Sequence, residues 1–188
     1  MNAIKTTNGT IVGQKVFLRP PVRSDLSECI ALNRASISFH RGLVSPPTVR
    51  EQFAAVLKRC RGVDSSCFFV CLVQDGPIVG SIDLSQIFRG NFQSAYLGYH
   101  VGERYARQGL MTEALQLMLR YAFEHLNLHR LEANVQPSNV ASIALIKRAG
   151  FTREGFSRRC LKIGGRWRDH ERWAIIAEDW KSSAKISQ

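Results

Sequence analysis

Apolar positions along the chain repeat either about every 3.6 residues or every second residue. The clearest helical pattern covers residues 112–126, and shorter ones cover 24–36, 48–60 and 139–149. In the longest segment the apolar stripe is expected to face the core. It consists of Met111, Leu115, Met118 and Ala122, with Leu117 and Tyr121 beside it.

Residues at the ends of these segments support the helix assignment. Ser24 or Asp25 can cap the first helix, since short polar side chains accept from free N–H groups there. Thr48 and Glu51 have the spacing of a capping box. Gly150 follows the last helix, a common place for glycine.

Runs rich in β-branched and aromatic residues predict the strands. The turn signals Asp75-Gly76 and Gly164-Gly165 join neighbouring strands into hairpins. We find no repeat or linker, so we expect one domain over 1–188, of mixed α/β (α+β) class, with a mostly antiparallel central sheet and helices on both faces. The expected strands are 15–20, 67–73, 78–84, 94–102, 128–135, 153–163 and 166–176.

Composition narrows the class of protein. The chain has 188 residues, of which 45% are hydrophobic, enough for a substantial core. No apolar run approaches the roughly 20 residues that span a bilayer, and the first 15 residues lack the pattern of a signal peptide. We therefore expect a cytoplasmic protein without membrane contact.

The five cysteines are an odd number, without CxxC pairs or matched histidines. This pattern predicts neither a disulfide framework nor a zinc site. We expect reduced, mostly buried thiols and no metal.

Charge is the strongest compositional signal. The 26 Lys and Arg against 15 Asp and Glu give a net charge of +11, which attracts polyanions such as nucleotides, RNA or ribosomal surfaces. Basic residues are dense in 148–172, where acidic residues interrupt them. A solvated basic face is the simpler interpretation, and direct nucleic-acid binding is not required.

The turn 107–112 lies between an expected strand and the longest helix. A helix N-terminus presents free N–H groups and a positive dipole end, which together favour an anion. Arg107 adds charge, and Gly109 has no side chain to hinder close approach of a phosphate. The turn matches neither the P-loop nor the GxGxxG fingerprint, and a lone glycine before a helix is more often structural, so the turn by itself does not identify a ligand.

A wider pattern surrounds this turn. The segments YLGYHVGERYARQGLMTEAL and HRLEANVQPSNVASIALIKRAGFTREG, followed by GGRWRDH, resemble the GNAT superfamily of N-acyltransferases, and within it the RimJ/RimL-type protein N-terminal acetyltransferases. The resemblance runs from about Val16 to Trp180. It implies a GNAT fold whose sheet splays at the acetyl-CoA site, acetyl-CoA as cosubstrate and an amine acceptor.

The resemblance also implies roles for particular residues. The pyrophosphate loop of the family corresponds to Ala106 through Met111, and these two end positions depart from its pattern. The backbone of Val101 would bind the pantetheine arm, Asn139 would contact that arm, and Ser142 would lie beside the sulfur. Asn139 and Ser142 also suit simple helix capping. The pyrophosphate would be bound by N–H groups of Arg107, Gln108, Gly109, Leu110, Met111 and Thr112.

Proton transfer is less well defined by the sequence. Many family members carry a tyrosine where this chain has Ile146, which favours Ser142 or water as the donor to the leaving thiolate. No carboxylate lies in 94–102 to act as a general base. His100, Tyr99 and His170 are nearby candidates, and Glu132 is a weaker one.

The expected acceptor is a primary amine that must be neutral to attack. An α-amine with a pKa near 8 meets this condition more easily than a lysine near 10.4. We therefore expect a protein N-terminus, such as that of a ribosomal protein, and a ribosomal-protein-alanine type of N-acetyltransferase. A small-molecule amine such as an antibiotic, polyamine or amino acid stays open as acceptor, as does a non-catalytic CoA- or ribosome-binding module. Both a monomer and a homodimer fit the sequence.

Overall fold

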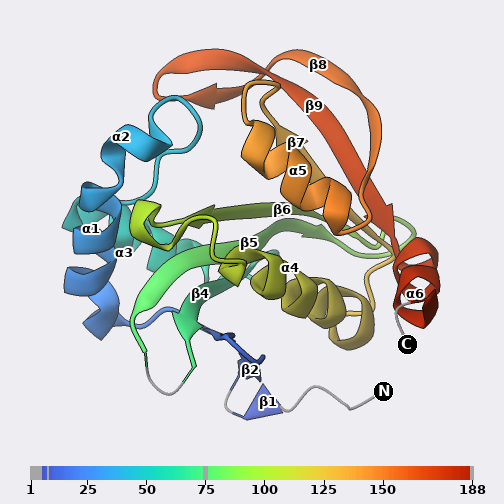
Figure 1. The fold of residues 1–188 in the computed structure, drawn as a ribbon, viewed down its shortest axis with the longest axis horizontal. Coiled ribbons are helices and arrows are strands. Elements are labelled where there is room, and N and C mark those ends of the chain that lie inside the picture. The colour runs from blue at the N-terminus through green and yellow to red at the C-terminus, as the bar shows by residue number, and fades with distance from the viewer. Residues whose placement is uncertain (1–5, 8, 74–75, 187–188) are drawn as a thin grey trace.

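The computed structural model describes residues 6–7, 9–73 and 76–186. One nine-stranded sheet runs through it in the order β1-β2-β3-β4-β5-β6-β7-β9-β8 (Figure 1). All neighbouring strands pair antiparallel except β6 and β7, which are parallel. The strands are β1 (Thr6–Thr7), β2 (Thr10–Val12), β3 (Val16–Arg19), β4 (Ser66–Leu72), β5 (Ile78–Phe88), β6 (Ser94–Val101), β7 (Arg130–Val135), β8 (Thr152–Ile163) and β9 (Arg166–Ile176).

Helices lie on both faces of this sheet, as predicted. None of the helices in the described part of the chain is long and apolar enough to cross a membrane. Short 3-10 turns occur at 23–25 and 103–105, and a π-helical turn at 121–125 extends α4. The helices are α1 (Leu26–Ala35), α2 (Ile37–His40), α3 (Arg50–Arg59), α4 (Leu110–Arg120), α5 (Val140–Arg148) and α6 (Ala177–Ile186).

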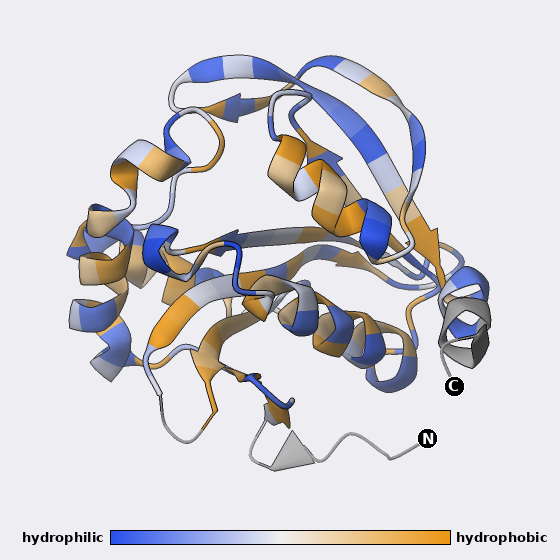
Figure 2. Ribbon diagram, viewed as in Figure 1, coloured by the Kyte–Doolittle hydropathy of each residue, from blue (hydrophilic) through white to orange (hydrophobic). Residues whose placement is uncertain are grey.

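Two apolar clusters fill the space between helices and sheet. The larger contains the predicted stripe of α4, and Leu115, Met118 and Ala122 are fully buried in it. The smaller joins α1 and α3 to the other face of the sheet, through Cys29 and Phe53 among others. Figure 2 shows apolar colour on the central strands and on the inner side of α4.

Most predicted elements form close to their expected positions. The strand at 78–84 continues to Phe88 because a β-bulge between Ser85 and Phe88 absorbs extra residues, with Gln86 at φ 50°. The expected hairpin joins β4 and β5 antiparallel, although Asp75 of its turn lies outside the described residues. Patterns in the sequence did not indicate β1, β2, α2 or α6.

The predicted N-cap was wrong for α3 and right in position for α1, where the expected side-chain bond is missing. Val49, not Thr48, is the N-cap of α3, and it has no side-chain cap bond, because the Thr48 N–H and hydroxyl both donate to the side chain of Gln52. Asp25 is the N-cap of α1, but its carboxylate pairs with Arg19 at 2.8 Å instead of bonding the first turn. The half-buried Arg19 guanidinium forms a charged, two-point pair with this carboxylate, which is stronger than a bond from a neutral N–H.

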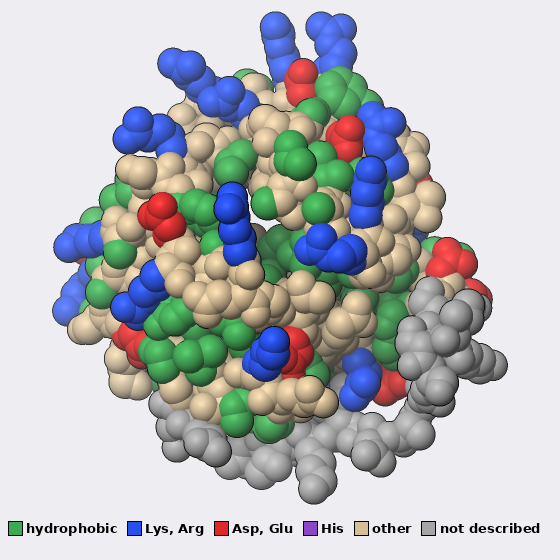
Figure 3. Space-filling view, viewed as in Figure 1, with side chains coloured by type: hydrophobic (Ala, Val, Ile, Leu, Met, Phe, Trp, Pro, Cys, Tyr) green, Lys and Arg blue, Asp and Glu red, His purple; other side chains and the backbone are tan. Residues whose placement is uncertain are grey.

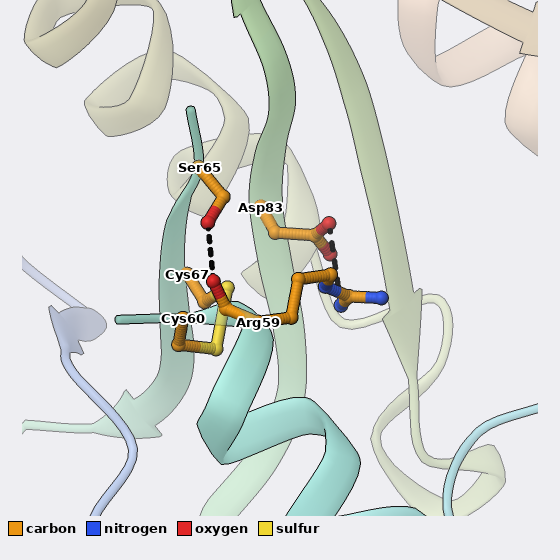
Figure 4. The surroundings of a disulfide bond; sticks show 5 residues. All are labelled: Arg59, Cys60, Ser65, Cys67 and Asp83. Carbon is orange, nitrogen blue, oxygen red and sulfur yellow. Dashed lines mark hydrogen bonds and ion pairs between the residues drawn. A yellow bond between two sulfur atoms is a disulfide. The ribbon is translucent and has the colours of Figure 1, made fainter. Parts of the chain in front are cut away.

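The expectation that all cysteines are reduced was also wrong. Cys60 and Cys67 form a disulfide across the turn between α3 and β4, with their Cα atoms 5.3 Å apart (Figure 4). Seven residues of separation and no CxxC spacing gave no signal of this pair. Cys29, Cys71 and Cys160 are free, and the first two are buried as expected. Beside the disulfide, Arg59 makes an ion pair with Asp83 of β5 at 3.7 Å.

Candidate active site

The sheet opens between its two parallel strands. β6 and β7 pair only from Ser94 to Tyr96 against Arg130 to Glu132, and then diverge, as Figure 1 shows. The N–H of Gly102 donates to the Val79 carbonyl of β5, so by antiparallel alternation the main chain of Val101 faces the gap. The gap therefore exposes backbone groups of β6 that need partners other than β7.

A cavity of about 950 Å³ passes through this opening. On the face that carries α4 and α5 it is lined by Gly109, Thr112 and Ser142. On the opposite face it is lined by groups from α2 and the sheet, including His40 and Asn134. Figure 3 shows a hollow in the middle of the molecule, lined by apolar side chains and flanked by Lys and Arg. Two reactants can thus meet at the gap from opposite faces of the sheet.

The turn before α4 has the geometry of an anion site. Gly109 is the N-cap of α4 with φ 78°, and Arg107 also has a positive φ of 62°. Around an added Cβ at Gly109 the nearest atom is Lys15 Nζ at 3.9 Å, so the space beside the glycine is open and next to a cation. An L-residue with positive φ is strained, and this conformation turns the backbone at the start of α4.

The six predicted loop residues contribute in different ways. Arg107, Gly109 and Thr112 line the cavity. Leu110 and Met111 also reach it, but their side chains are buried in the core, which leaves their N–H groups for an anion. Gln108 does not line the cavity, since its side chain donates to the Arg104 carbonyl.

Lys15 is a site residue that the sequence gave no reason to select. Glu113, in the first turn of α4, accepts from the backbone N–H groups of Gln14 and Lys15 and so fixes the turn between β2 and β3 over the helix end. A Cβ on Gly13 would overlap the Glu113 carboxylate and lie 2.9 Å from the Val16 carbonyl, so a larger residue would displace this contact. The turn places the Lys15 ammonium beside Gly109, 94 residues away in the chain.

Tyr99 and Ser142, both predicted as catalytic, are in contact. Their hydroxyl oxygens are 2.6 Å apart, across the opening from β6 to α5. One hydroxyl donates to the other, so the pair keeps one O–H to offer a ligand. Burial raises the pKa of Tyr99 to about 12, which keeps the phenol protonated. Ile146 is fully buried in the core and takes no part in the cavity wall.

Asn139 acts as a helix cap. Its side-chain oxygen accepts from the Ser142 N–H at 3.2 Å, and it is the N-cap of α5. It also lines the cavity. The capping bond involves only the backbone N–H of Ser142, so the Ser142 hydroxyl is free to contact Tyr99.

His100 is buried and uses both of its ring nitrogens in hydrogen bonds. Asn33 donates its amide N–H to the Pro47 carbonyl, so its oxygen accepts from His100 Nε2 at 3.2 Å. His100 Nδ1 then accepts from the Ser81 hydroxyl at 2.9 Å. Burial, with a contribution from His40, lowers the pKa of His100 to about 3. Neither nitrogen of His100 is free to take a proton.

His40 and His170 have different hydrogen-bond states. His40 Nε2 donates to the Val101 carbonyl at 2.9 Å, on the open edge of β6, and its buried Nδ1 has no partner among the described residues. His170 Nδ1 donates to the Arg168 carbonyl at 3.0 Å, so in the neutral ring Nε2 is the nitrogen without a hydrogen. His170 lines the cavity on the side away from α4.

Other carboxylates near the site are already paired. Glu132, the weaker base candidate, accepts from Arg130 at 2.9 Å, and Glu154 also pairs with Arg130. The Arg130 guanidinium lowers the pKa of Glu154. Among the described residues that line the cavity there is no Asp or Glu. The charged groups of its wall are Arg107 and Arg148.

Comparisons with known proteins identify the family of the chain. The acetyltransferase (GNAT) domain family matches residues 15–152. A probable N-acetyltransferase of Bacillus subtilis, YjcK, is 31% identical over 89% of this chain and 97% of its own length. The [ribosomal protein uS5]-alanine N-acetyltransferase of Escherichia coli K12 is 41% identical over 55% of this chain and 53% of its own length.

Two further relatives bear on cofactor and acceptor. A solved structure of Mycobacterium smegmatis RimJ in complex with CoA-disulfide has a TM-score of 0.80 and 29% identity, covering 87% of this chain and 82% of that one. The spermidine N(1)-acetyltransferase of Escherichia coli K12 is 29% identical over 59% of each protein. Because the family match spans most of the sequence, the chain belongs to the GNAT acetyltransferases, which use acetyl-CoA.

Proposed function

We propose that this protein transfers the acetyl group of acetyl-CoA to the N-terminal α-amine of a protein, in the cytoplasm. The observation that carries the proposal is the acceptor end of the cavity. Its wall combines amide and hydroxyl groups of Asn134, Gln136 and Ser85 with apolar side chains such as Phe39 and Leu43. Amide and hydroxyl groups can bond to a peptide main chain, while the apolar groups suit a small first side chain such as Ala or Ser.

A polyamine fits this wall less well. Polyamines carry several positive charges at neutral pH, and their burial needs carboxylates nearby. The described residues lining the cavity provide none. The similarity to ribosomal-protein-alanine acetyltransferases supports the protein acceptor, and a ribosomal protein is the acceptor we favour.

The cofactor end fits the phosphates and thioester of acetyl-CoA. The N–H groups at the start of α4, together with Arg107 and Lys15, would bind the pyrophosphate. The open main chain at Val101 would bind the pantetheine arm. When bound, acetyl-CoA supplies an activated acyl group with a thiolate leaving group.

Different residues serve the two proton transfers of the reaction. We assign His170 Nε2 the acceptance of a proton from the attacking amine, because it is the unprotonated nitrogen of a histidine in the acceptor wall. We assign the Tyr99–Ser142 pair the hydrogen bond to the departing sulfur, because it retains one O–H at the gap. His100 supports the site through hydrogen bonds and does not exchange its proton.

A peptide panel tests the proposed acceptor. Thiol release from acetyl-CoA is measured with peptides that begin with Ala or Ser, with the same peptides blocked at the α-amine but carrying an internal lysine, and with spermidine. We expect turnover with the free N-termini and little with the other two. Preferential acetylation of spermidine or of lysine would disprove the protein N-terminus, and no turnover with any amine would favour a non-catalytic CoA-binding module.

A further inference from the structure

The hairpin of β8 and β9 carries a basic surface that the acetyl-transfer site does not use. Its turn, Gly164-Gly165, projects beyond the rest of the sheet, above α2 and α5 in Figure 1. Figure 3 shows Lys and Arg side chains standing out from the same end of the molecule. We call Lys162, Arg166 and Trp167 the hairpin-tip surface.

Trp167 is the unusual member of this surface. Of the three tryptophans in the chain, Trp173 and Trp180 are buried, while Trp167 is 60% exposed. Trp167 pairs in register with Lys162 across the hairpin, so the two side chains lie on the same face. The neighbouring residues Leu161 and Ile163 line the cavity. By strand alternation, Trp167 and Lys162 point away from that cavity, whereas Arg166, which pairs with Ile163, lies on the other face at the tip of the hairpin.

The cations at this end of the hairpin lack carboxylate partners. Within the described part of the chain, no ion pair involves Lys162, Arg166, Arg158 or Arg159, all of which are exposed. The acidic side chains nearby are already bonded. Glu154 pairs with Arg130, Glu171 pairs with Arg153, and Asp169 accepts from the backbone of Arg159.

We propose that the hairpin-tip surface binds single-stranded RNA. An exposed aromatic ring with an unpaired cation, Lys162, on its own face and a second, Arg166, on the adjoining edge of the hairpin tip is a combination that suits single-stranded nucleic acids, since bases stack on the ring and phosphates pair with the cations. An acidic polypeptide could use the cations but has little use for an exposed indole. The excess charge of the whole chain, +11, favours the same kind of partner. This inference does not depend on the identity of the amine acceptor.

Fluorescence anisotropy with a labelled mixed-sequence RNA of roughly 12 nucleotides tests the proposal, a length within known site sizes. Trp167→Ala removes the stacking ring, and we expect Kd to rise roughly five- to hundredfold with the same salt dependence. Lys162→Ala with Arg166→Ala removes two phosphate contacts. We expect the slope of log K against log salt to become shallower by about 1.4, at about 0.7 for each contact on a single strand.

Controls separate this surface from the general charge of the protein. Lys58→Ala with Arg61→Ala changes two exposed cations at the far end of α3 and removes the same charge. We expect it to leave Kd and slope near the wild-type values. Quenching of tryptophan fluorescence by RNA should disappear in Trp167→Ala, since the other two tryptophans are buried. Melting temperature and acetylation of free peptides should stay unchanged in all variants.

Three results would overturn the proposal. One is wild-type affinity and salt slope in both hairpin variants. Another is an equal loss of affinity in the α3 control, which would indicate a diffuse charge effect. The third is displacement of RNA by polyglutamate at equal charge concentration, which would assign the surface to acidic proteins.

Discussion

Ser142 makes a structural hydrogen bond with its backbone and a separate hydrogen bond in the site with its side chain. Its N–H bonds to Asn139 as part of the α5 cap, and its hydroxyl bonds to Tyr99 at 2.6 Å. Ser142→Ala keeps the first bond and loses the second. We expect kcat to fall at least several-fold, since general acid catalysis contributes about 100-fold or more and water replaces part of it.

Cofactor affinity should change little in this variant, because one neutral hydrogen bond contributes only about 1 kcal/mol. Steady-state kinetics and calorimetry with CoA make the comparison. Tyr99→Phe removes the other hydroxyl and is the matched variant. Loss of thermal stability with normal turnover would assign Ser142 a structural role instead.

His170 and His100 allow a direct comparison of two histidines in one cavity. His170→Gln removes a nitrogen that is free to accept a proton, whereas His100→Gln removes one that is already bonded to Ser81. We expect kcat for a peptide to fall roughly 100-fold or more in the first variant and only slightly in the second. Binding of CoA should be normal in both. A larger loss of kcat in His100→Gln would reverse our assignment.

His100 also makes stability depend on pH. Its pKa is about 3 in the folded protein, against about 6.5 when unfolded, so the unfolded state takes up a proton first as pH falls. The free energy of unfolding should therefore decrease from about pH 6.5 downward, by at most about 1.4 kcal/mol per pH unit from this group. Urea unfolding measures the effect, and His100→Gln should show a weaker decline. Equal pH dependence in the two proteins would show that His100 titrates normally.

At the scale of elements, the close approach of β5 to β6 sets the position of the open edge of β6, where Val101 faces the gap. A Cβ on Gly80 would overlap the His100 carbonyl and lie 3.0 Å from the Val101 Cα. Gly80→Ala must push β6 toward the gap, and we expect weaker CoA binding together with lower stability by about 1 kcal/mol or more. Gly98→Ala is the control, because its Cβ would meet only Asp83 at 3.6 Å. Calorimetry with CoA and urea unfolding distinguish them, and equal behaviour would refute the close approach.

Periodicity and glycine positions predicted most helices and strands. Contacts between residues far apart in the sequence could not be predicted, because they depend on how the elements pack. The stripe of α4 and the strands of the last hairpin were confirmed because their signals are local. The cap of α3 moved from Thr48 to Val49, and Asp25 is the N-cap of α1 as expected but bonds Arg19 with its carboxylate. The contacts of Thr48 with Gln52 and of Asp25 with Arg19 are not part of the capping rules. The Cys60–Cys67 disulfide depends on where α3 ends against β4, which no spacing in the sequence shows.

In the candidate site, too, local features could be predicted from the sequence and long-range contacts could not. The turn at Gly109 could be predicted from local sequence, since a strand pattern precedes it and a helix pattern follows it. Lys15 reaches the turn only through Glu113, and His170 enters the cavity only because β9 pairs with β7. Contact between Tyr99 and Ser142 likewise depends on how α5 lies across the gap.

At the scale of the molecule, charge is divided between the two ends of one cavity. The cofactor end has Arg107, Arg148 and the nearby Lys15, and the described lining holds no carboxylate to offset them. The net charge of +11 adds an attractive field around that end. The acceptor end uses neutral amides and hydroxyls, so an amine approaches without an opposite charge to attract it. The two reactants should therefore respond differently to salt.

We expect the KM for acetyl-CoA to rise several-fold as ionic strength increases from roughly 0.01 M to 0.15 M, because the Debye length shrinks from about 30 Å to about 8 Å. The KM for an uncharged-side-chain peptide and the kcat should stay nearly constant. Lys15→Ala should raise the KM for acetyl-CoA at low salt and flatten its salt dependence, since it removes a cation beside Gly109. Initial rates at both salt concentrations, with each substrate varied in turn, make the test. A peptide KM that rises with salt as steeply as that of acetyl-CoA would instead reveal carboxylates that contact the acceptor.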